Sequence, residues 1–252
     1  MRKAGAAIQA ERLLQRYGID APEHIKLEAL AHLLHVEIID AATHGCVAQL
    51  TPIQGRARIR VAPNTQIGRR RFSIAHELGH LVLRHSSRAC TERDLRDWSD
   101  GSAAERDANV FAASLLMPER MIQKFVDVDE ASLEIAGAMA QEMSVSFTAA
   151  AIRFVETTAL ACAVLLVEDG RISWGIRNDE FTPHLPARGL RIDPSSRAAR
   201  VQPGATSEPL PVAVGCWLEG DGIANWTLAE DARMFRDGSV LVLLQLERDD
   251  DD

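Results

Sequence analysis

Hydrophobic residues in the first 160 positions recur mostly every three to four residues, which is the period of amphipathic helices. Ile8, Leu13 and Leu14 fall on one face of a helix predicted over residues 4–17. Pro22 opens the next helical stretch, because proline suits the first turn of a helix. The same period predicts further helices, at residues 25–34, 72–83, 103–117, 119–126, 131–142 and 147–157.

Short stretches after the second predicted helix have the pattern of strands instead. Residues 36–39, 47–50 and 57–61 are predicted strands, and a turn over residues 52–55 joins the last two. A small antiparallel sheet therefore precedes the helix at residues 72–83. The free edge of such a sheet suits the binding of an extended peptide.

The pattern changes after residue 158. Residues 162–167 and 171–176 flank Asp169-Gly170 and predict a hairpin. We expect further strands at residues 212–218 and 240–246, and a short helix at residues 228–235.

The fold class that follows is α+β. A mainly helical domain with a small antiparallel sheet is expected over residues 1–127. A helix-turn-helix-like unit follows over residues 128–158, and a smaller α+β domain over residues 159–252 ends in the acidic tail Asp249–Asp252.

Composition narrows the function classes. The chain has 252 residues and a net charge of −8, which argues against a generally basic nucleic-acid binder. Its apolar runs are too short to cross a bilayer, and its first residues lack the apolar core of a signal peptide. We therefore expect a cytoplasmic protein with no membrane partner. The four cysteines include no Cys-x-x-Cys pair, so a thiolate zinc knuckle is not expected.

The most informative segment is His76-Glu77-Leu78-Gly79-His80. Histidines four apart lie one helical turn from each other, so both imidazoles can reach one metal ion. Glu77 can then take a proton from a water molecule that the metal makes more acidic. This is the chemistry of zinc-assisted peptide hydrolysis.

A catalytic zinc ion also needs a third protein ligand. The candidates downstream are Cys90, Glu92, Glu105 and Asp107. Glu105 and Asp107 flank the apolar stripe of the helix at residues 103–117 on opposite sides, so helical periodicity does not choose between them.

Two segments in this order, residues 75–80 and residues 105–118, resemble the ImmA/IrrE family of metallopeptidases. The resemblance covers roughly residues 25–157. It implies a compact gluzincin-like domain that binds one Zn²⁺ ion.

Carried over residue by residue, the resemblance implies that Glu105 joins His76 and His80 as a zinc ligand and that Glu77 is the general base. Asp107 and Asn109 become candidates for groups that orient a ligating histidine; otherwise they are polar residues of the helix surface. The donor that stabilises the oxyanion stays open among four residues: Tyr17, His35, His44 and His85.

The resemblance also implies a biological role. Proteins of this kind cleave a helix-turn-helix transcriptional repressor and so induce genes for the response to DNA damage or for phage defence. The expected partner is therefore such a repressor, as substrate. Residues 159–252 lie where some relatives carry a sensor-like domain.

Two features suggest how activity is controlled. Cys90 lies between the two motif segments, where its thiolate would be a regulatory fourth zinc ligand. In the C-terminal domain, arginines and tryptophans together suit single-stranded DNA as an activator. The arginines of this nucleic-acid patch are Arg188, Arg191, Arg197 and Arg200.

Two other functions compete with the peptidase. The helices at residues 131–142 and 147–157 could belong to a DNA-binding transcriptional regulator, although Arg153 is the only cation in the second of them. A metal-binding module that sequesters its partner without cutting it is the other alternative.

Overall fold

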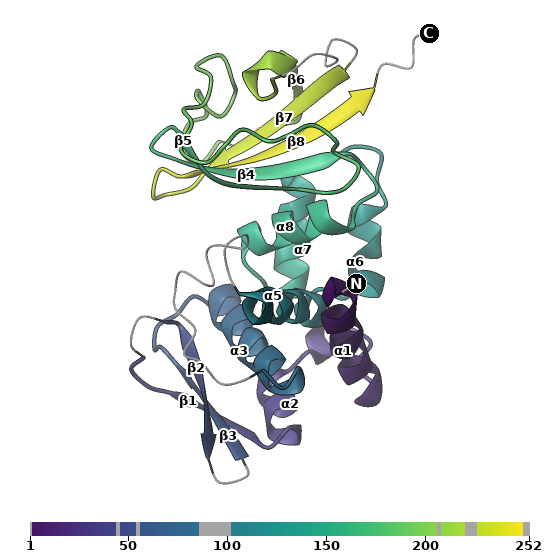
Figure 1. Cartoon of the computed structure of the whole chain (residues 1–252), viewed down its shortest axis with the longest axis vertical. Helices are drawn as coiled ribbons and strands as arrows, with labels where there is room; N and C mark the ends of the chain where they lie inside the picture. The colour runs from purple at the N-terminus through teal and green to yellow at the C-terminus, as the bar shows by residue number, and fades with distance from the viewer. Residues whose placement is uncertain are drawn as a thin grey trace. The chain divides into compact units, whose positions relative to one another are not determined.

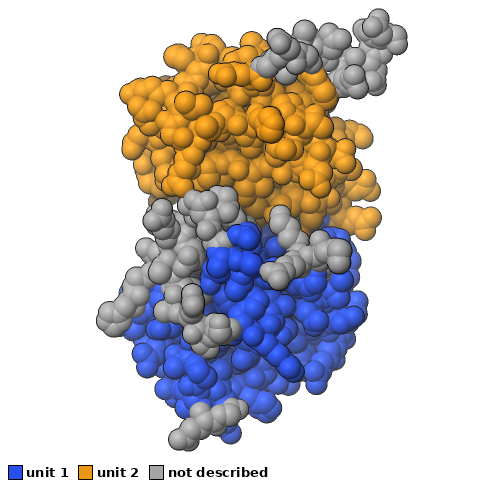
Figure 2. All heavy atoms as spheres, in the orientation of Figure 1, with its two compact units in different colours: residues 1–122, 141–146 blue, residues 123–140, 147–252 orange. Residues whose placement is uncertain are grey.

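The computed structural model describes residues 2–43, 46–53, 56–85, 102–205, 208–219 and 226–248. It has the expected α+β class, with a three-stranded and a five-stranded sheet among these residues (Figure 1). The chain forms two compact units, which Figure 2 distinguishes by colour. Unit 1 contains residues 1–122 and 141–146, and unit 2 contains residues 123–140 and 147–252. The three-part division made from the sequence, with boundaries after residues 127 and 158, stays a prediction.

Unit 1 is mainly helical. Its core includes Leu14, Leu30, Ile74, Leu78 and Phe111, none of which is more than 1% exposed. The helices that carry these residues are α1 (Arg2–Arg16), α2 (Leu27–Leu33), α3 (Ile67–Val82) and α5 (Ala103–Leu116), with a 3₁₀ turn at Pro22–His24. Among the described residues, no helix combines the length and apolar character needed to span a membrane.

The small sheet of unit 1 has the strand order β1-β3-β2. Its strands are β1 (Val36–Asp40), β2 (Ala48–Ile53) and β3 (Arg56–Val61). The hairpin of β2 and β3 is antiparallel as expected, but β1 pairs in parallel with β3, so the sheet is mixed. The difference arises because β3, with Ile59 fully buried, takes the centre and leaves β2 at an edge.

Residues 141–146 belong to unit 1 because their backbone lies against the start of α3. A Cβ atom on Gly68 would stand 2.6 Å from the backbone nitrogen of Ser146 and 2.7 Å from the carbonyl carbon of Val145. These distances are shorter than real Cβ contacts, so only glycine permits this approach.

Unit 2 holds a five-stranded antiparallel sheet with the strand order β5-β4-β8-β7-β6. The strands are β4 (Cys162–Glu168), β5 (Arg171–Arg177), β6 (Leu210–Val212), β7 (Trp226–Met234) and β8 (Val240–Arg248). The helices that precede them are α6 (Glu119–Val126), α7 (Leu133–Met143) and α8 (Phe147–Thr157), and α6 and α7 each cross the boundary between the units.

Two expectations for unit 2 were wrong. Residues 228–235 were expected to be helical, but Leu228–Met234 lie in strand β7 and pair with β8. Residues 212–218 were expected to be a strand, but β6 ends at Val212 and a 3₁₀ turn spans Val214–Cys216. In the first of these segments, pairing of β7 with β8 on one side and with β6 on the other overrides local helix propensity.

Two neighbouring polar side chains of β7 bind segments on the two faces of this sheet. The Glu230 carboxylate is fully buried and accepts hydrogen bonds from the backbone N–H groups of Arg197 (3.1 Å) and Ala198 (2.7 Å) and from Nε1–H of Trp217 (2.8 Å). The next residue, Asp231, points to the other face and accepts from the backbone N–H of Leu133 at 2.7 Å, at the first turn of α7.

Candidate metal centre

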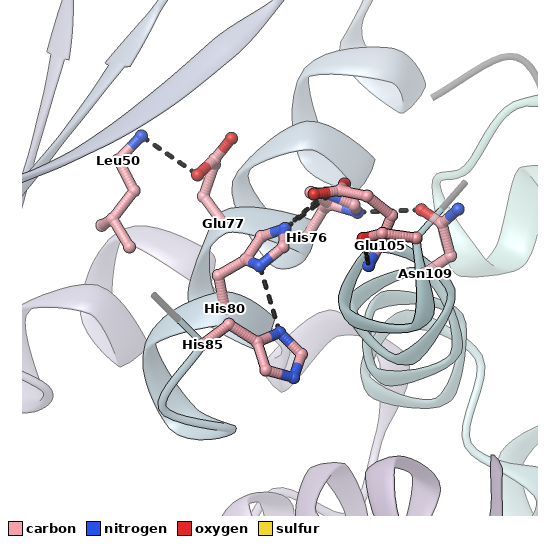
Figure 3. A network of polar contacts seen from close by, with 8 residues as sticks. Leu50, His76, Glu77, His80, His85, Glu105 and Asn109 are labelled. Atoms are coloured by element: carbon pink, nitrogen blue, oxygen red, sulfur yellow. Dashed lines mark hydrogen bonds and ion pairs between the residues drawn. The ribbon is translucent and has the colours of Figure 1, made fainter. Parts of the chain in front are cut away.

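His76 and His80 lie one turn apart on α3 and face the same side (Figure 3). They are 1% and 7% exposed, and their Nε2 atoms are 3.0 Å apart. The motif Phe72-Ser73-Ile74-Ala75 before His76 is buried as well, so the whole middle of α3 lies within unit 1. Burial of an imidazole costs free energy unless its nitrogens have hydrogen-bond or metal partners.

Glu105 reaches the same point from the first turn of α5. Ser102 caps this helix, and its Oγ accepts a hydrogen bond of 3.3 Å from the backbone N–H of Glu105. The carboxylate of Glu105 points to α3, where its Oε2 lies 3.1 Å from Nε2 of His76 and 3.4 Å from Nε2 of His80. The structure therefore brings together the three residues that the resemblance assigned to zinc.

Gly79 is what allows the two helices to approach each other so closely. A Cβ atom at this position would lie 3.0 Å from Cδ1 of Phe111 and 3.3 Å from both Cα and the carbonyl oxygen of Ala108. Ala108 and Phe111 are one and two turns after Glu105 on α5. The missing side chain of Gly79 therefore helps to set the distance from Glu105 to the two histidines.

The donor set fits a zinc ion. The three ligand atoms of His76, His80 and Glu105 all lie within 4.8 Å of one another, and among the described residues they are the only such group. Tetrahedral zinc with bonds of about 2.0–2.2 Å places neighbouring ligand atoms roughly 3.3 Å apart, close to the separations found here. Two imidazoles and one carboxylate also suit zinc in chemistry and leave one position open.

The surroundings of the centre determine the protonation states of Glu105 and His85. Burial raises the pKa of the Glu105 carboxyl, but hydrogen bonds from His76 and His80 outweigh it and hold that pKa well below its usual value. Burial lowers the pKa of His85, and the neighbouring His80 lowers it further. Glu105 is therefore ionised and His85 is neutral at physiological pH.

Asn109 orients the first histidine. Its Oδ1 lies 2.8 Å from Nδ1 of His76, and Asn109 is 3% exposed. Because an amide oxygen can only accept, Nδ1 of His76 carries a proton, and Nε2 is the nitrogen that faces Glu105 and His80. Asp107 makes no contact of this kind with a ligand residue, but its negative charge acts on His85.

Glu77 points away from this trio toward the small sheet (Figure 3). Its side chain is buried, and its Oε2 accepts a hydrogen bond of 3.0 Å from the backbone N–H of Leu50 in β2. Sequence reasoning did not find this contact, because a backbone amide at a strand edge leaves no residue-specific signal.

The other predicted residues have varied positions. Cys90 and Glu92, the two other candidates between the motif segments, lie outside the described residues, as does His44. Tyr17 and His35 make no described contact with the centre, whereas His85 lies beside His80. In unit 2, Arg188, Arg191 and Arg200 are exposed and Arg197 is half-buried.

A family model described as the IrrE N-terminal-like domain, Peptidase_M78, matches residues 30–155. The chain belongs to this family. The match includes both helices of the metal centre and the β2 strand beside Glu77. Membership of the IrrE N-terminal-like family supports a metallopeptidase-type domain, and the buried His-His-Glu group of that domain could hold a metal ion.

Comparison with solved structures extends the likeness to the whole chain. A transcriptional regulator of Mycobacterium tuberculosis is 15% identical, with a TM-score of 0.61 over 96% of this chain and 75% of the regulator. This likeness concerns the fold alone. No curated protein matches the chain in sequence.

The two helices of the expected helix-turn-helix-like unit are α7 and α8, but α8 exposes no face that could contact DNA. Residues 149–155 of α8 are buried without a break, and Arg153 is only 7% exposed. A recognition helix must present several side chains to a DNA groove. This burial counts against the alternative of a regulator that reads DNA with this pair.

Proposed function

We propose that this protein is a zinc-dependent endopeptidase that cleaves a helix-turn-helix transcriptional repressor. The observation that carries the proposal is the convergence of His76, His80 and Glu105, with ligand atoms 3.0–3.4 Å apart, beside a buried Glu77 on the same helix. In the proposed site the trio holds the metal and Glu77 is the general base.

A zinc ion bound here would supply Lewis-acid chemistry, polarising a peptide carbonyl and making water more acidic. The proton transfers are carried out by side chains of the protein. Glu77 takes a proton at its carboxylate and returns it to the leaving amine, as a general base and then a general acid. The Leu50 amide holds one oxygen of that carboxylate in place, and the buried surroundings of α3 limit access of bulk water.

Strand β2 supports a peptide as the substrate. It is an edge strand, and its Leu50 N–H points away from β3 toward Glu77. In an antiparallel pair the carbonyl of the same residue faces the same way, so the edge of β2 that faces away from β3 carries an acceptor group next to the proposed base. An extended segment of a repressor can add to this edge as a further strand, which places its backbone beside Glu77.

We further propose that cleavage induces stress-response genes, for DNA damage or phage defence, in the cytoplasm. Membership of the IrrE N-terminal-like family supports regulated proteolysis, and a structural neighbour described as a transcriptional regulator agrees with a regulatory role. Binding of a signal by unit 2 is the proposed route of activation.

Single-stranded DNA is the proposed signal. Arg188, Arg191 and Arg200 are exposed on one connecting segment of unit 2 and offer charge for phosphates. Trp217 is buried and bonded to Glu230, so base stacking would have to come from other side chains. If affinity for a single-stranded oligonucleotide does not fall when these three arginines are changed to glutamine, this segment is not the sensor.

The deciding experiment is co-expression of a helix-turn-helix repressor, encoded by a gene next to that of this protein, with the wild-type protein or with Glu77→Gln. We expect cleavage with the wild type alone, and mass spectrometry of the fragments then gives the scissile bond. If the repressor stays intact but co-purifies with both proteins, also when single-stranded DNA is added, the protein sequesters its partner and the peptidase proposal is wrong.

A further inference from the structure

The C-terminal end of α3 returns the chain toward the metal centre. After the last helical residue, Val82, Arg84 takes a left-handed conformation with φ of 56°. The backbone N–H of His85 then donates to the carbonyl of His80 (2.9 Å), and that of Arg84 to the carbonyl of Leu81 (3.1 Å). This pair of bonds defines a Schellman cap, which is unusual here in having arginine where glycine is common.

The cap places the ring of His85 against the ring of His80. Their Nδ1 atoms are 3.1 Å apart, and the two rings meet edge to face with centroids 5.2 Å apart (Figure 3). A Schellman cap usually brings two apolar side chains together at these positions. In this protein the same geometry joins two imidazoles, one of which belongs to the metal-binding trio.

A short contact between two Nδ1 atoms requires one proton between them. His80 turns its Nε2 toward Glu105 and His76, at 3.4 and 3.0 Å. For that nitrogen to offer a lone pair to a metal, the proton of the neutral ring must sit on Nδ1 of His80. Nδ1 of His85 then accepts the hydrogen bond, and His85 carries its own proton on Nε2.

We propose that His85 is a positioning residue that fixes the tautomer and orientation of His80 for metal binding. The inference rests on the proposed function of the same site and extends it beyond the ligands. The site then has one dedicated acceptor for each histidine, since Oδ1 of Asn109 holds Nδ1 of His76 at 2.8 Å. The acceptors come from different helices, α5 for His76 and the cap of α3 for His80. Such partners of ligating histidines typically change metal affinity 10- to 100-fold when they are removed.

The role differs from the alternatives that the sequence left for His85. As an oxyanion donor it would have to use Nε2–H, because its Nδ1 is engaged by His80. As a mere positive charge at the helix end, His85 would donate from Nδ1, so Nδ1 of His80 would have to accept and the His80 proton would sit on Nε2, where it blocks metal binding. The contact with His80 therefore favours a neutral acceptor.

Three variants of the full chain test the proposal through zinc affinity, measured by competition with a chromophoric chelator. His85→Leu keeps the side-chain size and removes the acceptor, and we expect zinc to bind 10- to 100-fold more weakly. His85→Asn restores an acceptor near the position of Nδ1, and we expect affinity within a few-fold of the wild type. His32→Leu is the matched control, because His32 is exposed on α2, and we expect no change.

The outcomes separate the inference from the proposed function. If the wild type itself binds no zinc, the metal site is wrong and the role of His85 falls with it. If the wild type binds zinc but His85→Leu binds equally well, or His85→Asn is as weak as His85→Leu, only the role of His85 is wrong. A ¹⁵N NMR measurement on the zinc-loaded wild type needs no variant. It should find the proton of His80 on Nδ1, and a proton on Nε2 would overturn the proposal.

Discussion

The backbone N–H of Leu50 donates a 3.0 Å hydrogen bond to Oε2 of Glu77, and so couples the edge strand β2 to the proposed general base. The two residues are 27 positions apart. The bond fixes the orientation of the Glu77 carboxylate. This hydrogen bond therefore also fixes the position of the Glu77 carboxylate relative to strand β2.

Removing this donor should impair turnover without loss of the metal. Leu50→Pro deletes the N–H group, which faces Glu77 rather than β3. A hydrogen bond to a charged group contributes about 1.5–3 kcal/mol, so we expect kcat to fall on the order of 10- to 100-fold. The measurements are kcat on the repressor and the zinc content of the purified variant.

The control is Leu50→Ala, which shortens the side chain but keeps the N–H. It should retain most of the wild-type kcat. Equal losses in the proline and alanine variants would mean that the side chain of Leu50, and not its amide, matters to the site.

Sequence patterns could predict helix α3 with its two histidines, but not the hydrogen bond from Leu50 to Glu77. The spacing of His76 and His80 fixes their common face, because side chains four apart on a helix coincide. Glu105 became a ligand only through the family resemblance, since periodicity left Asp107 equally open. The Leu50 amide and the contact between His80 and His85 depend on how the chain folds back. The first contact spans 27 positions, and the second comes from a helix cap with arginine where glycine is usual, so neither has a recognisable sequence signal.

Adding one methyl group at Gly79 should disturb both stability and metal binding. In Gly79→Ala the new Cβ would stand 3.0 Å from Phe111 and 3.3 Å from the backbone of Ala108, so α5 must move away from α3. Overpacking of this kind costs about 1–3 kcal/mol. We expect a lower free energy of unfolding and weaker zinc binding, because Glu105 moves with α5.

Gly5→Ala is the matched control for this change. Gly5 also lies in a helix, but a Cβ there meets no atom within 4 Å. This variant should be as stable as the wild type or more stable, by up to about 1 kcal/mol, since alanine favours the helix. If urea unfolding and zinc affinity are unchanged in Gly79→Ala, α3 and α5 can accommodate a methyl group and the close approach at Gly79 does not matter.

Unit 2 shows where sequence reasoning fails for a physical reason. Leu228-Ala229-Glu230-Asp231-Ala232-Arg233-Met234 contains mostly good helix formers, and this composition favoured a helix. The segment is nevertheless strand β7, held between β6 and β8. The strand alternation also separates Glu230 from Asp231, so that each serves a different face of the sheet.

The buried carboxylate of Glu230 should be essential to unit 2. Glu230→Gln replaces one acceptor oxygen by an NH₂ group that faces the N–H donors of Arg197, Ala198 and Trp217. Hydrogen bonds to a charged group contribute about 1.5–3 kcal/mol each, so we expect the free energy of unfolding to fall by roughly 3 kcal/mol. Urea unfolding followed by circular dichroism measures it. Glu168→Gln, at an exposed strand end, should change little, and equal stability of both variants would contradict the role of Glu230.

Acid should destabilise the metal-free protein through Glu105. Burial raises the pKa of this carboxyl, but hydrogen bonds from His76 and His80 hold it below the usual 4.5. A carboxyl with a lowered pKa in the folded state stabilises that state fully above pH 4.5, and the contribution is lost as the pH falls toward the folded-state pKa. With a chelator present, the Tm of the wild type should therefore drop more steeply below pH 4.5 than the Tm of Glu105→Gln. Glu23→Gln, which removes an exposed carboxylate of the same unit, should follow the wild type. Parallel melting curves for the wild type and Glu105→Gln would mean that the histidines do not stabilise the Glu105 carboxylate.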